Sequence, residues 1–263
     1  MSHLPAPLAR WLYSVTSVGL LIPHFPHSEF PTVRRLITSS PICLVLGFAL
    51  CVSAVSAEET SLFDGKSLEG WRGQAELWTV EDGAIVGRTS ASDPIKTNTF
   101  LIYDGETPSD FELRLRYRIE SGNSGVQYRS RVVDEDKFIV GGYQADIEVT
   151  NHYTGINYEE RGRGILAQRG QRVTIAADGE KQVESFADGA EIAKSFKVDG
   201  WNDYKIVAKG NRLQHFINDV LTCEVIDGQP EKAATEGVIA LQLHVGPPMV
   251  VKFKEIVIDT IEN

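Results

Sequence analysis

Cysteine is scarce in this sequence, and apolar runs are short. The chain has 3 cysteines in 263 residues. Cys43 and Cys51 fall in a predicted leader, so Cys223 alone remains for the folded part, which excludes an internal disulfide and a CxxC metal site. We expect Cys223 to pack as a small apolar side chain rather than act as a nucleophile. The longest apolar run, residues 42–52, is too short for a comfortable transmembrane helix.

Positive charge is also in deficit, and several catalytic motifs are missing. Lys and Arg number 26 against 36 Asp and Glu, giving a net charge of −10. This excess argues against nucleic acids and anionic membranes as partners. The sequence has no phosphate-binding Gly-rich loop, no HExxH, no GxSxG and no EF-hand ligand run. It requires no cofactor, and a divalent cation is possible but unsupported by any ligand spacing.

Residues 1–57 are predicted to be a leader. Arg34 and Arg35 precede the apolar run, and small residues end at Ala57, as in a secretory signal peptide. We therefore expect export to the periplasm or beyond the cell, with no membrane association after the leader is removed. Residues 1–33 are rich in proline and unusually long for this role, which suggests either a start site assigned too far upstream or a long leader. Residues 58–263 are expected to form one domain.

Short alternating segments separated by Asp-Gly turns predict an all-β fold. Asp-Gly pairs favour tight turns, and they recur at 64–65, 82–83, 104–105, 178–179, 188–189, 199–200 and 227–228. Strands are expected between them, including 191–196 and 213–218, with His215 near a hairpin tip at the surface. Only 153–164 and 228–236 are left for a turn of helix. We favour a two-sheet antiparallel jelly-roll sandwich, concanavalin A-like, in which the last strand returns beside an early one; a barrel is the alternative.

Several predicted strands carry polar residues along one face. Such a row either faces water or lines a cleft, and mixed amides, carboxylates and cations suit a polyol ligand. The rows are Gln144, Asp146 and Glu148; Gln127, Arg129 and Arg131; Gln242 and His244; and Lys252 and Lys254.

The candidate acids and bases come from two of these rows, and one loop adds candidate binding residues. Asp146 and Glu148 have Cα atoms about 7 Å apart along a strand, which does not separate retaining from inverting glycoside hydrolysis. His244 fits either a site or the core. The loop 151–166, with Tyr158 and Arg163, suits a cover over a site or a surface loop braced by its own ion pairs.

A known family shares a set of segments with this chain. Taken in order, residues 61–71, 78–87, 110–130, 142–149 and 237–258 resemble the 3-keto-disaccharide hydrolase domain family. The resemblance implies a concanavalin-like jelly roll that acts on glycosides whose C3 hydroxyl has been oxidised to a ketone. The loop 158–166 departs from the family pattern, which leaves the leaving group open.

The resemblance also implies roles for the polar rows. A C3 ketone acidifies the C2 proton, so that a base can start the loss of the C1 substituent. Glu148, Asp146 and His244 are the implied catalytic candidates, with Arg129, Arg163 or Lys252 near the enolate. Hydroxyl-binding roles fall to Gln127, Gln144, Tyr158 and Gln242. The ketone requires a separate sugar-oxidising dehydrogenase. A non-catalytic carbohydrate-binding module and a conventional glucanase are the alternatives.

Overall fold

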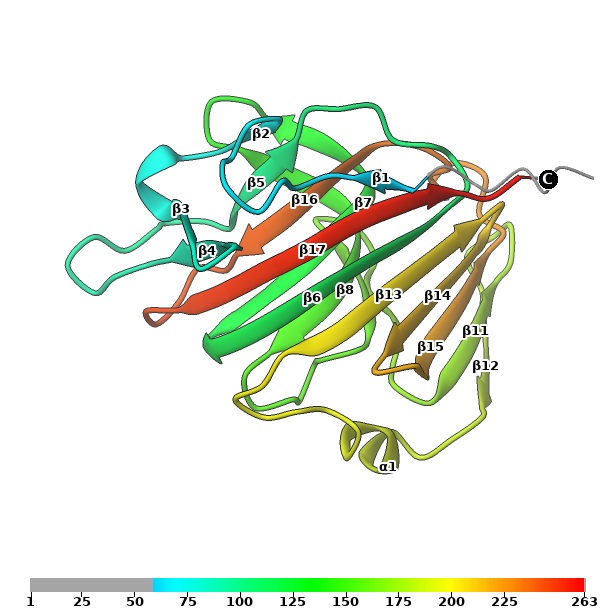
Figure 1. Ribbon diagram of the computed structural model, residues 1–263. Helices are drawn as coiled ribbons and strands as arrows, with labels where there is room; N and C mark the ends of the chain where they lie inside the picture. Colours follow the sequence, from blue (N-terminus) through cyan, green and yellow to red (C-terminus); the bar gives the residue numbers. More distant parts are fainter. Residues whose placement is uncertain (1–58, 263) are drawn as a thin grey trace, which may run out of the picture. The chain divides into compact units, whose positions relative to one another are not determined.

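Two β-sheets packed face to face make up the computed structural model, which describes residues 59–262 (Figure 1). Sheet A runs, in spatial order, through β12 (Lys181–Ser185), β11 (Gln171–Ile175), β15 (Val220–Asp227), β14 (Arg212–Ile217), β13 (Asn202–Lys209), β6 (Phe111–Ser121), β17 (Val250–Thr260), β4 (Ala84–Arg88) and β3 (Trp78–Glu81), with β1 (Thr60–Ser61) beside β17. Sheet B runs through β10 (Gly164–Ala167), β9 (Asn157–Glu160), β8 (Ile139–Glu148), β7 (Asn123–Asp134), β16 (Val238–Leu243), β5 (Thr99–Tyr103) and β2 (Trp71–Arg72).

The strand order confirms the predicted jelly-roll sandwich. The C-terminal strand β17 pairs with β6, β4 and β1, so the end of the chain returns beside early strands, as expected. Within residues 59–262, all strand pairings are antiparallel except that of β11 with β15. Figure 1 shows β17, β6 and β13 in one layer, with β16, β7 and β8 in the other.

The main core fills the space between the sheets. Along β6, Phe111, Leu113 and Leu115 are buried while the residues between them are partly exposed, because successive side chains of a strand point to opposite faces. On β8 the same alternation buries Ala145 and Ile147 in the core. The alternation read from the sequence therefore sets which face of each sheet is apolar.

The outer face of sheet B carries a second apolar cluster. Phe100, Ile102, Val140 and Ala240 are buried there, on the parity opposite to the main core. A bulge in β7 lies next to this cluster. Arg129 has φ 45°, and the register of β7 with β8 shifts between Tyr128 and Arg131. The expected face shared by Gln127, Arg129 and Arg131 is therefore wrong, because a bulge breaks the period of two.

Two further sequence predictions need correction. The segment 191–196 is not a strand, because its first half belongs to α1 (Gly189–Ala193), at whose start the Asp188 carboxylate accepts a hydrogen bond from Ala190 N. A 3-10 turn, η1 (Ala75–Leu77), lies elsewhere. The stretches 153–164 and 228–236 hold no helix. His215 is fully buried rather than at the surface, because it shares the inward parity of Leu213 and Ile217.

The structure tests the prediction for Cys223 but not the prediction of a leader. Cys223 is a buried free thiol with 0% exposure, which confirms the expected packing role. Residues 1–57, including Cys43 and Cys51, lie outside the described residues, so the leader remains a prediction. Within residues 59–262, no helix is long and apolar enough to cross a membrane.

His215 gives the fold a specific sensitivity to acid. Its Nε2 lies 2.9 Å from Tyr128 Oη, its Nδ1 lies 3.2 Å from Ile156 O, and burial lowers the pKa of the imidazole to about 3. The unfolded chain therefore binds a proton between about pH 6.5 and 3 that the folded protein rejects, so stability falls with falling pH by up to about 1.4 kcal/mol per pH unit.

We expect His215→Gln to be less stable than the wild type at pH 7 but to lose less stability between pH 6.5 and 4. Urea unfolding across this range measures the slope. The same substitution at the exposed His152 is the control, and it should leave the slope unchanged. Equal slopes in His215→Gln and wild type would show that the buried imidazole does not control acid unfolding.

Candidate functional site

The outer face of sheet B contains a pocket of about 330 Å³ beside the second apolar cluster. This sheet B pocket collects side chains from β7, β8, β9 and β10 and from the segments that precede β5 and follow β16. Its volume is at the lower end of the range for small-molecule sites, about 300–1,000 Å³. The lining residues are Asn98, Asn123, Gln144, Asp146, Tyr153, Ile156, Tyr158, Glu160, Ile165 and His244.

The floor of the sheet B pocket comes from the polar face of β8. Gln144 and Asp146 point outward because Ala145 and Ile147 occupy the core-facing parity. β8 lies between β7 and β9, and Asp146 is registered with Gly125 of β7. The missing side chain at Gly125 leaves room for Gln144 to lie across the strand toward Asp146.

Asp146 is a buried carboxyl with a strongly altered acidity. It is 6% exposed, and burial raises its pKa to about 7, with the negative charges of Glu160 and Glu148 acting in the same direction. One hydrogen bond opposes this shift, from Gln144 Nε2 to Asp146 Oδ1 at 2.8 Å. A carboxyl that titrates near pH 7 can take up and release a proton at neutral pH.

Asn98 braces the polar side of the pocket. Its Nδ2 donates to Glu160 Oε1 at 3.1 Å, and its Oδ1 accepts from Val245 N at 2.9 Å. One amide therefore links β9 to the segment that carries His244, immediately after β16. His244 is half-buried and lines the same pocket as Asp146 and Glu160.

Apolar and aromatic side chains complete the pocket lining. Tyr153, Ile156, Tyr158 and Ile165 come from the β8–β9 loop, β9 and β10. Tyr153 is 41% exposed, and its ring meets His152 edge-on at 4.4 Å between centroids. Exposed tyrosine rings combine an apolar face with a polar tip, which suits contact with a sugar ring.

Glu148 holds the loop that carries Tyr153 and does not line the pocket. Glu148 Oε2 accepts from Thr150 Oγ1 at 2.6 Å and from His152 N at 3.0 Å. The backbone N–H of Glu148 also holds this loop, because it donates to Thr154 Oγ1 at 2.8 Å. The structure therefore separates the two neighbouring carboxylates, with Asp146 in the pocket and Glu148 supporting its rim.

The three predicted cations lie away from the pocket. Arg129 donates to Ser109 O and Gly210 O, and its side chain is 1% exposed. Lys252 lies on sheet A, 2.9 Å from Glu120. These two side chains hold the fold together at places that the sheet B pocket does not reach.

Arg163 is also a structural cation. It pairs with Asp227 at 2.6 Å and with Glu159 at 2.5 Å, and all three side chains are largely buried. Asp227 belongs to β15, so this cluster joins the β9–β10 turn of sheet B to sheet A. Removing one partner from such a buried cluster typically costs about 3–5 kcal/mol.

The predicted amides Gln127 and Gln242 lie beside Gln144 and do not line the pocket. Gln127 and Gln242 are both fully buried, on β7 and β16. Gln127 Nε2 donates to Gln144 Oε1 at 2.8 Å, and Gln242 Oε1 lies 3.5 Å from Gln144 Nε2. Gln144, Asp146, Tyr158 and His244 are thus the predicted site residues that the structure brings together in one pocket.

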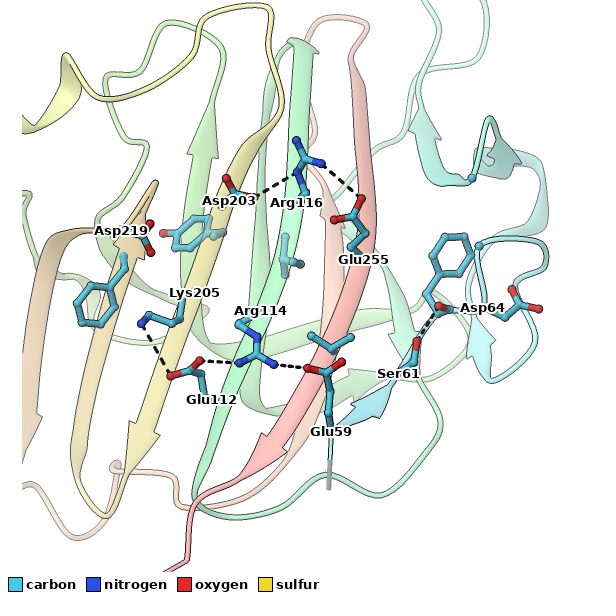
Figure 2. A pocket seen from close by; sticks show the side chains of 17 residues that line it. Glu59, Ser61, Asp64, Glu112, Arg114, Arg116, Asp203, Lys205, Asp219 and Glu255 are labelled. Atoms are coloured by element: carbon cyan, nitrogen blue, oxygen red, sulfur yellow. Dashed lines mark hydrogen bonds and ion pairs between the residues drawn. The ribbon is translucent and has the colours of Figure 1, made fainter. Parts of the chain in front are cut away.

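A larger hollow of about 710 Å³ lies on the outer face of sheet A (Figure 2). Its cations are already matched by carboxylates: Arg114 pairs with Glu59 and Glu112, and Arg116 with Asp203 and Glu255. Exposed pairs of this kind contribute about 0–1 kcal/mol each and leave no unpaired cation for a ligand. We take the smaller pocket as the candidate functional site because a buried carboxyl with a raised pKa lines it together with aromatic and amide side chains.

Sequence reasoning missed three polar residues of the pocket: Glu160, Asn98 and Asn123. Glu160 shares the parity of Tyr158 along β9, so a strand assignment for 157–160 would have found it. Asn98 and Asn123 lie at or before strand starts, where sequence gives no periodic signal. Within residues 59–262, no group of three or more His, Cys, Asp or Glu side chains is arranged to hold a metal ion.

Comparison with known proteins places this geometry in context. The sequence model of the 3-keto-alpha-glucoside-1,2-lyase-like domain matches residues 58–259. A candidate glycosyl hydrolase from Parabacteroides distasonis has a similar structure, with a TM-score of 0.51 at 18% identity, covering 78% of this chain and 100% of that chain. At this identity the likeness concerns the fold alone, and it agrees with the jelly roll. No curated protein sequence matches this chain.

Two more solved structures have lower scores. The carbohydrate-binding module CBM66 from Bacillus subtilis has a TM-score of 0.48 at 15% identity, covering 73% of this chain and 96% of that chain. A laminarinase from Flavobacterium sp. UMI-01 has a TM-score of 0.49 at 8% identity, covering 77% of this chain and 99% of that chain.

The buried carboxyl in the pocket should destabilise the protein at neutral and alkaline pH. Asp146 has a folded pKa of about 7 and an ordinary value of 3.8, so the folded protein holds a proton that the unfolded chain releases between about pH 4 and 7. Stability from this group is present below pH 4 and is lost as pH rises through 7. We expect Asp146→Asn to be more stable than wild type at pH 8, by about 2–4 kcal/mol, and nearly equal at pH 4.

Urea unfolding at the two pH values measures this difference. The exposed Asp219 gives the control, because Asp219→Asn should change stability by less than about 0.5 kcal/mol at either pH. A stability gain that is the same at pH 4 and pH 8 would contradict the assigned titration of Asp146.

Proposed function

The chain belongs to the 3-keto-alpha-glucoside-1,2-lyase-like domain family, and from this premise we propose that it cleaves glycosides carrying a ketone at C3. The observation that carries the proposal is the buried Asp146, whose pKa of about 7 suits proton transfer at neutral pH. His244 lines the same pocket and supplies a second group able to exchange a proton.

The proposed reaction is an elimination. The carboxylate of Asp146 takes the C2 proton, and the electrons of the C2–H bond move to give an enolate on the C3 oxygen. The enolate then collapses, forming a C1=C2 double bond and breaking the bond from C1 to its substituent. The departing oxygen takes a proton, so the products are an unsaturated 3-ketosugar and an alcohol. Addition of water to C1 completes a net hydrolysis.

The other pocket residues divide into polar and apolar roles. We assign His244 as the donor that protonates the departing oxygen, and Asn123 as a hydrogen-bond donor to substrate oxygen. Tyr158 and Tyr153 contact the sugar or its substituent through their ring faces. The predicted enolate cations Arg129, Arg163 and Lys252 have no part in this proposal, because their partners lie outside the pocket.

One observation favours a second function, ordinary glycoside hydrolysis. Asp146 and Glu160 line one pocket, and a pair of carboxyl groups in which one has a raised pKa is the usual equipment of glycosidases. In that mechanism Asp146 would protonate the glycosidic oxygen and Glu160 would act as nucleophile or base. The two reactions differ in substrate, because only the elimination needs a ketone.

The proposal extends to the cellular setting. The predicted leader would direct the protein out of the cytoplasm. Residues 59–262 contain one free cysteine and no disulfide, so their stability there relies on the two apolar clusters. A separate sugar-oxidising dehydrogenase must supply the ketone, because no hydride acceptor is part of the proposed chemistry.

Matched substrates test the proposal directly. The full chain is incubated with a 3-keto-glucoside and with the same glucoside left unoxidised, and release of the aglycone is followed together with deuterium uptake at C2 in heavy water. We expect release from the oxidised substrate only. Asp146→Asn should lower kcat by about 10²–10⁴-fold because the base is lost, and His244→Gln should lower it by a smaller factor.

Lys252→Gln is the matched control and should retain wild-type activity, because Lys252 lies on sheet A. Release from the unoxidised substrate would replace the elimination with two-carboxylate hydrolysis. Tight binding of either sugar without release would make the protein a carbohydrate-binding module.

A further inference from the structure

A ladder of three side-chain hydrogen bonds ends on Asp146 in the pocket floor. Ser130 Oγ donates to Gln127 Oε1 at 2.6 Å, and Gln127 Nε2 donates to Gln144 Oε1 at 2.8 Å. Gln144 Nε2 then donates to Asp146 Oδ1 at 2.8 Å. The four side chains are between 0% and 6% exposed, so water does not compete for these bonds.

The donor and acceptor of each hydrogen bond in the ladder are set by the carboxylate at its end. An ionised carboxylate only accepts hydrogen bonds, so Gln144 must present Nε2 to Asp146 and therefore Oε1 to Gln127. Gln127 must then present Nε2 to Gln144 and Oε1 to the hydroxyl of Ser130. Each amide orientation is thus fixed by the next one, and Gln144 Nε2 also lies 3.5 Å from Gln242 Oε1.

The ladder engages one carboxyl oxygen and leaves the other. Oδ1 of Asp146 accepts from Gln144, whereas Oδ2 accepts from no side chain or backbone group of the described residues. Oδ2 is also not among the fully buried atoms without a partner in residues 59–262, so it keeps access to the pocket that Asp146 lines.

The hydrogen-bond donor to Asp146 is a neutral amide, so it can orient the carboxyl group without adding a positive charge beside it. No Lys or Arg lines the sheet B pocket among the described residues. The titratable groups around Asp146 are Glu148 on its own strand, Tyr153 in the β8–β9 loop, Glu160 and Tyr158 on β9, His244 after β16, and Tyr204 on β13 of sheet A. An arginine in place of Gln144 would fix the carboxylate equally well but would strongly favour its ionised form.

We propose that Gln144, held by Gln127 and Ser130, is a positioning residue that fixes Oδ1 of Asp146 and makes Oδ2 the oxygen that exchanges the substrate proton. The identity of that proton, the one on C2, rests on the proposed function. The geometric part, which oxygen is fixed and by what, rests only on the ladder.

Gly125 is also needed for Gln144 to reach Asp146. A Cβ built on Gly125 would lie 2.6 Å from both Cγ and Cδ of Gln144, well inside contact distance. Gly125 faces Asp146 across the β7–β8 pairing, so the lack of a side chain is what allows Gln144 to reach the carboxyl. Its backbone does not have the positive φ that would demand glycine. Alanine there acts on Gln144 rather than on the chain path.

The test measures the titration of Asp146 by carboxyl ¹³C NMR on the full chain, with Asp146→Asn used for assignment. Gln144→Met removes the N–H that favours the ionised form, so the acid dissociation of Asp146 should weaken about tenfold and its midpoint should rise by about one pH unit. Gly125→Ala, which changes no hydrogen-bonding group, should move the midpoint in the same direction.

Gln214→Met is the matched control. Gln214 Nε2 donates to the buried Glu224 at 2.7 Å on sheet A, so this variant also removes an amide donor from a carboxylate, but away from the pocket. The Asp146 midpoint should stay at its wild-type value. Thermal unfolding shows whether each variant is folded before its titration is measured.

Kinetics provide the second readout. On a 3-keto-glucoside, Gln144→Met should lower kcat at least tenfold with KM within twofold, and the midpoint of its pH–rate profile should rise together with the NMR midpoint. An unchanged Asp146 midpoint in folded Gln144→Met and Gly125→Ala would overturn the positioning role, even if the wild type cleaves the substrate. A shifted midpoint in a protein that cleaves neither sugar would leave the positioning role standing and reject the proposed function.

Discussion

The pairing of β7 with β8 is the constraint on which the candidate site depends. Its register places Gly125 opposite Asp146 and Gln127 opposite Gln144, so one strand supplies the space and the amide that the other strand needs. A shift by one residue would turn Asp146 toward the core and Ala145 toward the pocket, because side chains alternate along a strand. The apolar residues between the sheets therefore fix the chemistry on the outer face as well as the stability of the fold.

This arrangement produces an acid–base group without a charged partner. Burial, Glu160 and Glu148 all disfavour ionisation of Asp146, and one neutral amide partly offsets them. The hollow on sheet A shows the contrasting case, where arginines and carboxylates satisfy one another at the surface. Exposed ion pairs contribute little to stability. A buried carboxyl whose charge is only partly compensated lowers stability but has the shifted pKa that is typical of groups that transfer protons.

Much of the fold could be predicted from alternation, because a half-buried strand must place apolar residues on one parity. The same rule identified Asp146 and Gln144, and it should have placed His215 inside with Leu213 and Ile217. It could not predict the bulge at Arg129, since that backbone conformation depends on the contacts the guanidinium makes with Ser109 and Gly210. Nor could it separate Asp146 from Glu148, because the turn that engages Glu148 forms only when Thr150 and His152 fold back.

The cluster of Arg163, Glu159 and Asp227 affects how the pocket is held in place. It ties the β9–β10 hairpin to sheet A, so Tyr158 and Ile165 line the pocket from an anchored hairpin. The turn around Tyr153 is held differently, by Glu148, which accepts from Thr150 Oγ1 and His152 N, and by Arg169, which donates to His152 O and Thr154 O. The aromatic side chains of the pocket are therefore held in place by charged groups that do not themselves line it.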